Sequence, residues 1–175
     1  MRDLESAPID HLVFDCCQEL FAAYDLVLAP RQRESLPAQD QLMFCSVMGF
    51  AGKQMRGALV LASSREPLEA TNSTNASSDT AQRDWVCELS NQLMGRVKNR
   101  LLALGAEVHL ATPAGLSGKN LSLAPETLRL PQVFTAAGGY VCVWIDCEYL
   151  EGFELTMTPS GNMEAALPEG EALLF

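Results

Sequence analysis

The stretch "DWVCELSNQLMGRVKNRLLALG", residues 84–105, predicts one long amphipathic helix, because its apolar residues recur at helical spacing. At roughly 100° per residue one broad arc is apolar. The residues on this apolar arc are Trp85, Leu89, Leu93, Val97, Leu101 and Leu104. The opposite arc carries Asp84, Glu88, Asn91, Gly95 and Lys98. A helix with so wide an apolar arc must pack on a large apolar partner, such as one face of a sheet.

Gly95 is unexpected inside this helix, since glycine costs about 0.8–1 kcal/mol relative to alanine in a helix interior. It lies on the polar arc beside Glu88 and Asn91, so something outside the chain could need to come close to that face. Two plainer interpretations stay open. Glu88 and Asn91 could be an ordinary solvated helix face, and Gly95 could be a packing accident or a close contact with a neighbouring strand.

Length and charge limit the class of protein. The 175 residues suit a single domain, 1–175, with a core at about 9–158, a flexible loop at about 68–80 and a loose acidic tail at about 160–175. The net charge is −10 and no basic stripe is visible, which argues against nucleic-acid binding. The start, "MRDLESAPID", is not a secretory signal, and the longest apolar runs are far short of a membrane span. We therefore expect a cytoplasmic protein that does not enter a membrane.

The cysteines and histidines do not indicate a metal site. None of the six cysteines forms a C-x-x-C pair, which favours reduced core cysteines in a chain without an export signal. His11 and His109 lack ligand spacing, and His109 is expected on a strand surface. Asp84 and Glu88 share one helix face, but a carboxylate pair alone is weak support for a cation.

The remaining segments predict a mixture of helices and hairpins. A first helix is expected over about 9–24, followed by a Pro-marked connector over 30–37. Residues 41–50 and 58–63 predict a hairpin, 106–113 a single strand, and 140–149 with 153–159 a closing hairpin. Ser78 or Asp79 can cap the long helix, and Gly105 can end it in a left-handed conformation. Helices alternating with mostly antiparallel strands indicate an α+β fold.

A weak internal repeat is visible in this order, since a helix is followed by paired strands twice. The second helix carries Glu88-x-x-Asn91-x-x-x-Gly95. The first helix carries an acid, an amide and a small residue at matching spacing, namely Asp15, Gln18 and Ala22.

The stretch "ELSNQLMGRVKNRLLALG" resembles the second-repeat helix of the CheC/CheX-type chemotaxis phosphatases. The shared features are the Glu88-x-x-Asn91 pair, the small residue Gly95, and the following strand "VHLATP" that ends at Pro113. The hairpin "MFCSVMGFAGKQMRGALVLAS" and the closing strands are also similar. This resemblance covers most of residues 9–158 and implies two helix-plus-β-hairpin pseudo-repeats, with the helices packed on a mostly antiparallel sheet.

The resemblance also implies an activity. Such proteins hydrolyse the acyl phosphate on the aspartate of a phosphorylated response regulator, which supplies its own lysine and its own divalent cation such as Mg²⁺. By resemblance, Asn91 would hold the attacking water and Glu88 would pair with the regulator's lysine. Asp84, Gly95 and Lys98 would then contact the partner. The protein needs no cofactor of its own in this scheme.

The first repeat departs from the family pattern. Gln18 could orient a water, but Asp15 is one carbon shorter than the family glutamate, and Cys16 and Cys17 need not leave that face exposed. We therefore expect Asp15 and Gln18 to form a vestigial second site.

Two alternatives of other classes stay open: a catalytically silent adaptor of the same fold in chemotaxis or the flagellar switch, and a structural dimerisation module. Exposed Glu88 and Asn91 side chains without internal partners would favour the phosphatase. A buried or internally bonded pair would favour the alternatives. Relatives with one active repeat are often dimers, so the resemblance also favours a homodimer.

Overall fold

The computed structural model describes residues 8–31, 40–73, 77–119, 121, 131–150 and 152–156. The helices are α1 (Pro8–Ala22), α2 (Arg65–Thr71) and α3 (Asp79–Ala103). The strands are β1 (Ala29–Arg31), β2 (Met43–Gly52), β3 (Met55–Ser63), β4 (Val108–Leu110), β5 (Ala114–Gly118), β6 (Gln132–Ala136) and β7 (Gly139–Tyr149).

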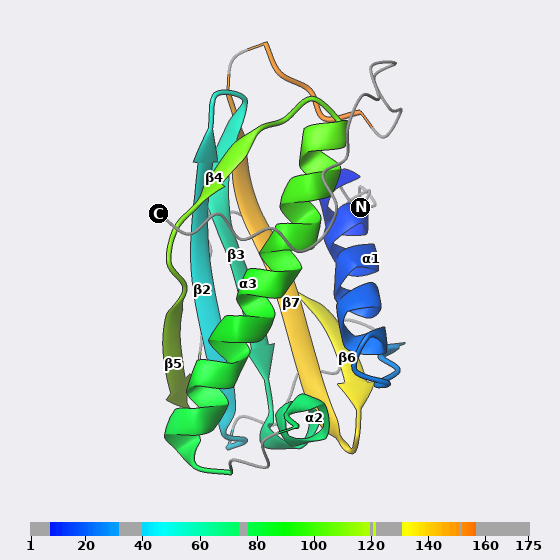
Figure 1. The fold of residues 1–175 in the computed structure, drawn as a ribbon, viewed down its shortest axis with the longest axis vertical. Helices are drawn as coiled ribbons and strands as arrows, with labels where there is room; N and C mark the ends of the chain where they lie inside the picture. Colours follow the sequence, from blue (N-terminus) through cyan, green and yellow to red (C-terminus); the bar gives the residue numbers. More distant parts are fainter. Residues whose placement is uncertain are drawn as a thin grey trace, which may run out of the picture.

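The described strands form one antiparallel sheet with the order β1-β6-β7-β3-β2-β4, and β5 also pairs with β2. Helices α1 and α3 lie side by side on one face of this sheet and run in opposite directions, whereas α2 sits at one end (Figure 1). The predicted α+β class, with helices packed on an antiparallel sheet, is confirmed.

The internal repeat is also present, and its two halves exchange their edge strands. Hairpins β2–β3 and β6–β7 meet at the centre of the sheet through β3 and β7. Strand β1, which precedes the first hairpin, pairs with β6 of the second hairpin. Strands β4 and β5, which precede the second hairpin, pair with β2 of the first. Each half therefore completes the sheet of the other.

The apolar arc of α3 forms the centre of the core, as its periodicity predicts. Leu89, Leu93, Val97 and Leu101 are fully buried, and Trp85 and Leu104 are half-buried at the two ends of the arc. Burial of one such side chain stabilises a fold by roughly 1.5–3 kcal/mol. These contacts fix the rotation of α3 about its own axis, so its polar arc faces outward.

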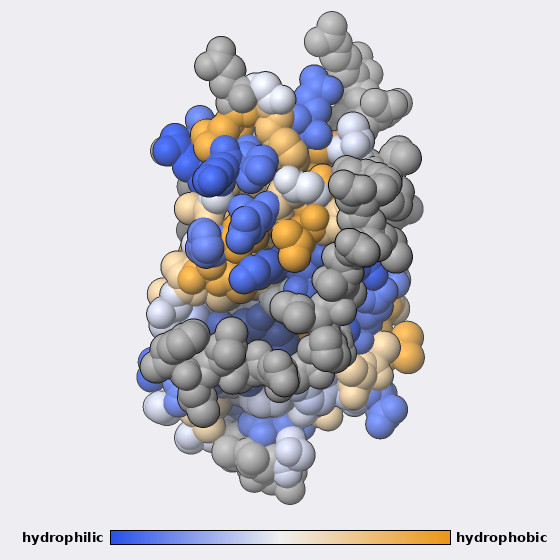
Figure 2. Space-filling view, turned by 45° about the horizontal axis from the view of Figure 1, so that its top comes forward, coloured by the Kyte–Doolittle hydropathy of each residue, from blue (hydrophilic) through white to orange (hydrophobic). Residues whose placement is uncertain are grey.

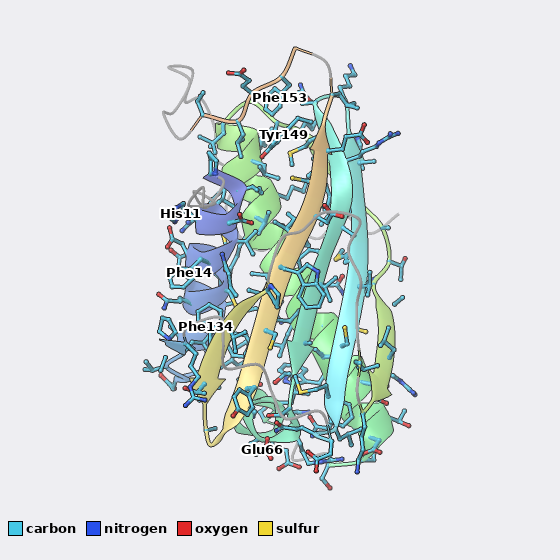
Figure 3. All side chains as sticks on the ribbon, turned by 180° about the vertical axis from the view of Figure 1, so that it is seen from behind. His11, Phe14, Glu66, Phe134, Tyr149 and Phe153 are labelled. Carbon is cyan, nitrogen blue, oxygen red and sulfur yellow. The ribbon has the colours of Figure 1, made fainter. Side chains whose placement is uncertain are left out.

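Helix α1 completes this layer. Its Phe14 ring packs against Phe134 of β6, with ring centroids 5.2 Å apart (Figure 3). His11 lies on the outer side of α1 and is exposed (Figure 3). At the other end of the sheet, Phe153 packs on Tyr149, with ring centroids 6.1 Å apart (Figure 3).

Both long helices end in the same way. At the end of α3, Gly105 has φ 85°, the Ala106 N–H donates to the Leu101 carbonyl at 2.8 Å, and the Gly105 N–H donates to the Leu102 carbonyl at 3.0 Å. This is a Schellman motif with glycine in the left-handed position.

At the end of α1 the left-handed position is held by Asp25, with φ 58°. The Leu26 N–H donates to the Phe21 carbonyl at 3.1 Å, and the Asp25 N–H donates to the Ala22 carbonyl at 3.0 Å. At the start of α3, Ser78 is the N-cap and its Oγ accepts from the Ala81 N–H at 3.2 Å, as expected.

Two sequence-based expectations are wrong. The bounds expected for the flexible loop, about 68–80, are wrong because residues 68–71 belong to α2 and 79–80 to α3, and residues 74–76 lie outside the described residues. The polar composition of this segment concealed α2, which is ordered by burial of Leu68 and by the Thr71 hydroxyl donating to the Pro67 carbonyl at 3.0 Å.

The expected closing hairpin between 140–149 and 153–159 is also wrong, since residues 152–156 are not a strand and 157–159 lie outside the described residues. Strand β7 instead pairs with β6, through a turn at Ala137 and Gly138, which both have positive φ. β6 had no alternating signal because three of its five residues, Val133, Phe134 and Ala136, are apolar and buried and the other two are half-buried.

Strand β1 was expected as part of a connector, and its pairing with β6 depends on residues more than a hundred positions away. The predicted acidic tail, 160–175, lies outside the described residues. No helix within the described ranges is both long and apolar enough to cross a membrane.

The two helix ends give a matched pair of stability predictions. Asp25→Gly should raise the free energy of unfolding by about 0.5–1 kcal/mol, because glycine adopts the left-handed conformation without the steric cost of a side chain. Gly105→Ala should lower it by about 1 kcal/mol for the converse reason. Urea unfolding of the two variants beside wild type measures both effects. A loss of stability in Asp25→Gly would show that the aspartate side chain itself contributes to the turn.

Candidate functional site

The polar arc of α3 forms a straight surface strip, which we call the α3 stripe: Asp84, Glu88, Asn91, Gly95 and Lys98. Spacings of three and four residues place these positions along one line of a helix, about 21 Å long at 1.5 Å per residue. Asp84, Glu88 and Asn91 are exposed, and Gly95 and Lys98 are half-buried. The structure therefore brings together all five residues that the sequence analysis placed on this face.

Asn91 is the exposed amide at the middle of the stripe. Its side chain makes no hydrogen bond or ion pair with any residue in the described part of the chain. A carboxamide has an acceptor oxygen and two N–H donors, so it can bind a water molecule in a defined orientation. The buried arc on the other side of α3 holds this amide on a rigid support.

Glu88 lies one turn before Asn91 and is exposed, but it has an internal partner. The Gln92 Nε2 donates to Glu88 Oε1 at 3.1 Å, and the Tyr24 hydroxyl donates to Gln92 Oε1 at 2.9 Å. Among the described residues, no Lys or Arg forms an ion pair with Glu88. The carboxylate is thus positioned by a neutral amide and keeps its charge uncompensated.

Tyr24 is itself held in place from two sides. Its backbone N–H donates to the Phe21 carbonyl at 3.0 Å in the turn that ends α1. Its ring meets the Trp85 ring edge-on, with centroids 5.7 Å apart and an interplanar angle of 85°. The Trp85 Nε1 donates in turn to the Thr71 Oγ1 of α2 at 2.9 Å.

Gly95 has no intramolecular reason to be a glycine in the described structure. Apart from its chain neighbours and the nearby backbone of α3 itself, a Cβ built at this position meets no atom within 4 Å. The interpretation that Gly95 makes a close contact with a neighbouring strand is therefore wrong for the described residues. The space over Gly95 is open to an approaching molecule.

The corresponding face of α1 is arranged differently. Asp15 is exposed, but its Oδ2 lies 3.7 Å from Arg100 Nη1, and the Glu19 Oε1 lies 2.5 Å from Arg100 Nη2. Gln18 is half-buried, and Cys16 and Cys17 are fully buried. The acid of the first repeat therefore already has a cation from α3 beside it, whereas the acid of the second repeat does not.

The cysteines do not add a reactive centre to this surface. All six are free, and four of them, Cys16, Cys17, Cys45 and Cys142, are buried. Burial raises the pKa of Cys16 to about 11 and the pKa values of Cys45 and Cys142 to about 12. Burial also raises the pKa of Cys87, which lies beside Glu88, so its thiol stays protonated at neutral pH. His109 is exposed on β4, as expected.

The outer surface near the end of α3 is mixed in character. Leu102 follows Lys98 by one turn and is 55% exposed. Figure 2 shows apolar and hydrophilic residues interspersed over this end of the molecule.

Sequence reasoning missed the residues that support Glu88. Gln92 was visible as an i, i+4 neighbour of Glu88, which is a spacing known to pair side chains on a helix. Tyr24 lies 68 residues before Gln92, and no local pattern links the two. The contact depends on how the end of α1 packs beside α3.

Comparison with known proteins places this geometry in a family. The family model described as chemotaxis phosphatase CheX matches residues 44–140, from β2 to the first residues of β7. Comparison with curated proteins gives no match.

Similar solved structures share the fold at low sequence identity. Chemotaxis protein CheX from Vibrio vulnificus has a TM-score of 0.68 and 19% identity, with 83% of this chain and 100% of that chain covered. A CheC-like superfamily protein from Shewanella sp. PV-4 has a TM-score of 0.66 and 22% identity, with coverages of 80% and 97%. A CheX–CheY–BeF3–Mg²⁺ complex from Borrelia burgdorferi has a TM-score of 0.61 and 17% identity, with coverages of 78% and 96%.

The family match spans more than half of the chain, including the hairpin β2–β3 and the whole of α3. The chain therefore belongs to the chemotaxis phosphatase CheX family.

Proposed function

We propose that this protein dephosphorylates the phospho-aspartate of a response regulator, with the α3 stripe entering the regulator's active site. The observation that carries the proposal is Asn91. Its exposed carboxamide has no internal partner among the described residues. It lies on a helix whose opposite face is buried in the core, one turn from a glutamate that forms no internal ion pair. Membership of the CheX family supports the reaction class.

For hydrolysis of the acyl phosphate, the protein would mainly have to position the attacking water and the regulator. A water oxygen attacks the phosphorus in line, the bond from phosphorus to the aspartate oxygen breaks, and the aspartate leaves as a carboxylate. The product is inorganic phosphate, which carries the protons of the water or passes one to solvent. The Asn91 side-chain oxygen would accept a hydrogen bond from the water O–H and hold the water oxygen behind the phosphorus.

Glu88 would serve the docking rather than the bond cleavage. Its carboxylate, uncompensated within the described structure, suits a cation in the regulator's active site, and a lysine there is the partner that the family resemblance implies. The divalent cation would come with the regulator. A solved relative is bound to CheY with BeF3 and Mg²⁺, which supports a response regulator as the class of partner.

A catalytically silent adaptor is the second candidate, and one observation favours it. Glu88 is hydrogen-bonded inside the chain, to Gln92, so only Asn91 satisfies in full the criterion for an active site. The two candidates differ in a single measurement, since an adaptor would bind the regulator and leave its acyl phosphate intact.

The first prediction concerns Asn91. Asn91→Ala should slow the loss of acyl phosphate from a ³²P-labelled response regulator by on the order of 10²–10³-fold, because the water loses its positioning amide. Binding of the regulator should change little.

The matched control is Asn99→Ala, which removes an exposed amide two turns further along the same helix. Asn99→Ala should retain the wild-type rate. Equal rates for Asn91→Ala and wild type would reject Asn91 as the residue that positions water.

Gly95→Ala separates stability from activity. The variant should raise the free energy of unfolding by about 0.8–1 kcal/mol, because alanine favours the helix and its Cβ meets no atom of the described structure. The same methyl group should raise KM or lower the rate of hydrolysis, because it holds the regulator away from Asn91. Urea unfolding and the phosphatase assay measure the two effects. A variant that is more stable and fully active would show that no partner comes close at Gly95.

Glu88→Ala should act mainly on docking. We expect KM for the phosphorylated regulator to rise about tenfold to a hundredfold, with a smaller change in kcat, as for loss of a hydrogen bond between charged groups. Glu107→Ala removes the same charge from an exposed position just beyond α3 and serves as the control. A similar rise in KM for both variants would mean that net charge, rather than Glu88, governs the encounter.

A further inference from the structure

We propose that Tyr24 and Gln92 are positioning residues that hold the Glu88 carboxylate ready for the regulator. This inference rests on the proposed function. It assigns a role to two side chains outside the Glu88-x-x-Asn91 pair, one of them on a different part of the chain.

The polarity of the hydrogen bonds carries the argument. The amide of Gln92 has an acceptor end and a donor end, and only one orientation presents its N–H to Glu88. The Tyr24 hydroxyl donates to the Gln92 oxygen at 2.9 Å, which fixes that orientation, and the Gln92 Nε2 then donates to Glu88 Oε1 at 3.1 Å. Without the hydroxyl, the amide loses the contact that determines which end faces Glu88.

The anchor of Tyr24 makes this chain of contacts rigid. The edge-on Trp85 ring and the turn at the end of α1 fix the tyrosine ring. Thr71 fixes Trp85 by accepting its indole N–H, and the Thr71 hydroxyl donates to the backbone of α2. The Glu88 side chain is therefore coupled through Gln92 and Tyr24 to the end of α1. Through Tyr24, the contact of Trp85 with Thr71 also couples it to α2.

The charge of the group that contacts Glu88 matters as much as its geometry. On the α1 face, the Arg100 guanidinium lies beside Asp15 and Glu19 and compensates part of their negative charge. At Glu88 the internal partner is a neutral amide, which orients the carboxylate but leaves its full charge for an external cation. A carboxylate that binds a cation of the partner is best oriented by a neutral group, since an internal cation would compete with the regulator's cation for the carboxylate.

The experiment is a double-mutant cycle with Tyr24→Phe and Glu88→Ala, assayed with ³²P-labelled phosphorylated regulator. Phenylalanine keeps the ring that packs on Trp85 and removes only the hydroxyl. In the wild-type background, Tyr24→Phe should raise KM about threefold to tenfold, the effect of one lost neutral hydrogen bond, with kcat nearly unchanged. In the Glu88→Ala background, Tyr24→Phe should have no further effect on KM. Tyr140→Phe, a half-buried tyrosine on β7, is the matched control and should leave KM unchanged.

The outcomes separate the inference from the function on which it rests. An equal effect of Tyr24→Phe in both backgrounds would overturn the inference, because the hydroxyl would then act through the fold and not through Glu88. If wild type hydrolyses no regulator, the proposed function fails, and NMR of the free protein decides the positioning role. Side-chain ¹⁵N relaxation of Gln92 should show an ordered amide in wild type and a mobile one in Tyr24→Phe. A mobile amide in wild type would overturn the positioning role.

Discussion

Burial of the apolar arc of α3 is the constraint on which the rest of the molecule depends. Leu89, Leu93, Val97 and Leu101 are fully enclosed between the sheet and α1, so the helix has only one rotational setting. A rotation that moved Asn91 toward the sheet would bring these four leucine and valine side chains into water. The exposed amide and carboxylate are thus placed by the hydrophobic core, and no pocket or loop is needed to present them.

The two halves of the molecule use the same helical framework with opposite electrostatic results. Each half carries an acid and an amide at equal spacing, and each acid is approached by a side chain from near the end of the opposite helix. Arg100 approaches Asp15 from α3, whereas Tyr24 approaches Glu88 through Gln92 from the end of α1. Asp15 has a cation beside it, whereas Glu88 contacts only a neutral amide that a hydroxyl orients. Two nearly equivalent helices therefore present one carboxylate with an internal ion pair and one that can still pair with an external cation.

The α3 stripe and the core arc could be predicted from sequence because both follow from a single helical period over more than twenty residues. The hairpin β2–β3 was likewise predictable, since both strands and their turn are adjacent in the chain. Local patterns failed where pairing is non-local: β6 was unassigned and β7 was matched with the wrong partner. They failed for α2 because its seven residues are mostly polar. The support of Glu88 by Tyr24 was invisible because it requires the packing of α1 on α3.

The exchange of edge strands between the two halves has a consequence for how the chain folds. Residue 29 pairs with residue 135, and β3 finds its central partner only in β7, so neither half can close its own sheet. Contacts this distant along the chain slow folding, since loop closure precedes the energetic gain. On the ribosome, the hairpin β2–β3 emerges with both outer edges unpaired, and the edge of β3 stays unpaired until β7 has been synthesised. The sheet that supports α3 is therefore among the last parts of the protein to be completed.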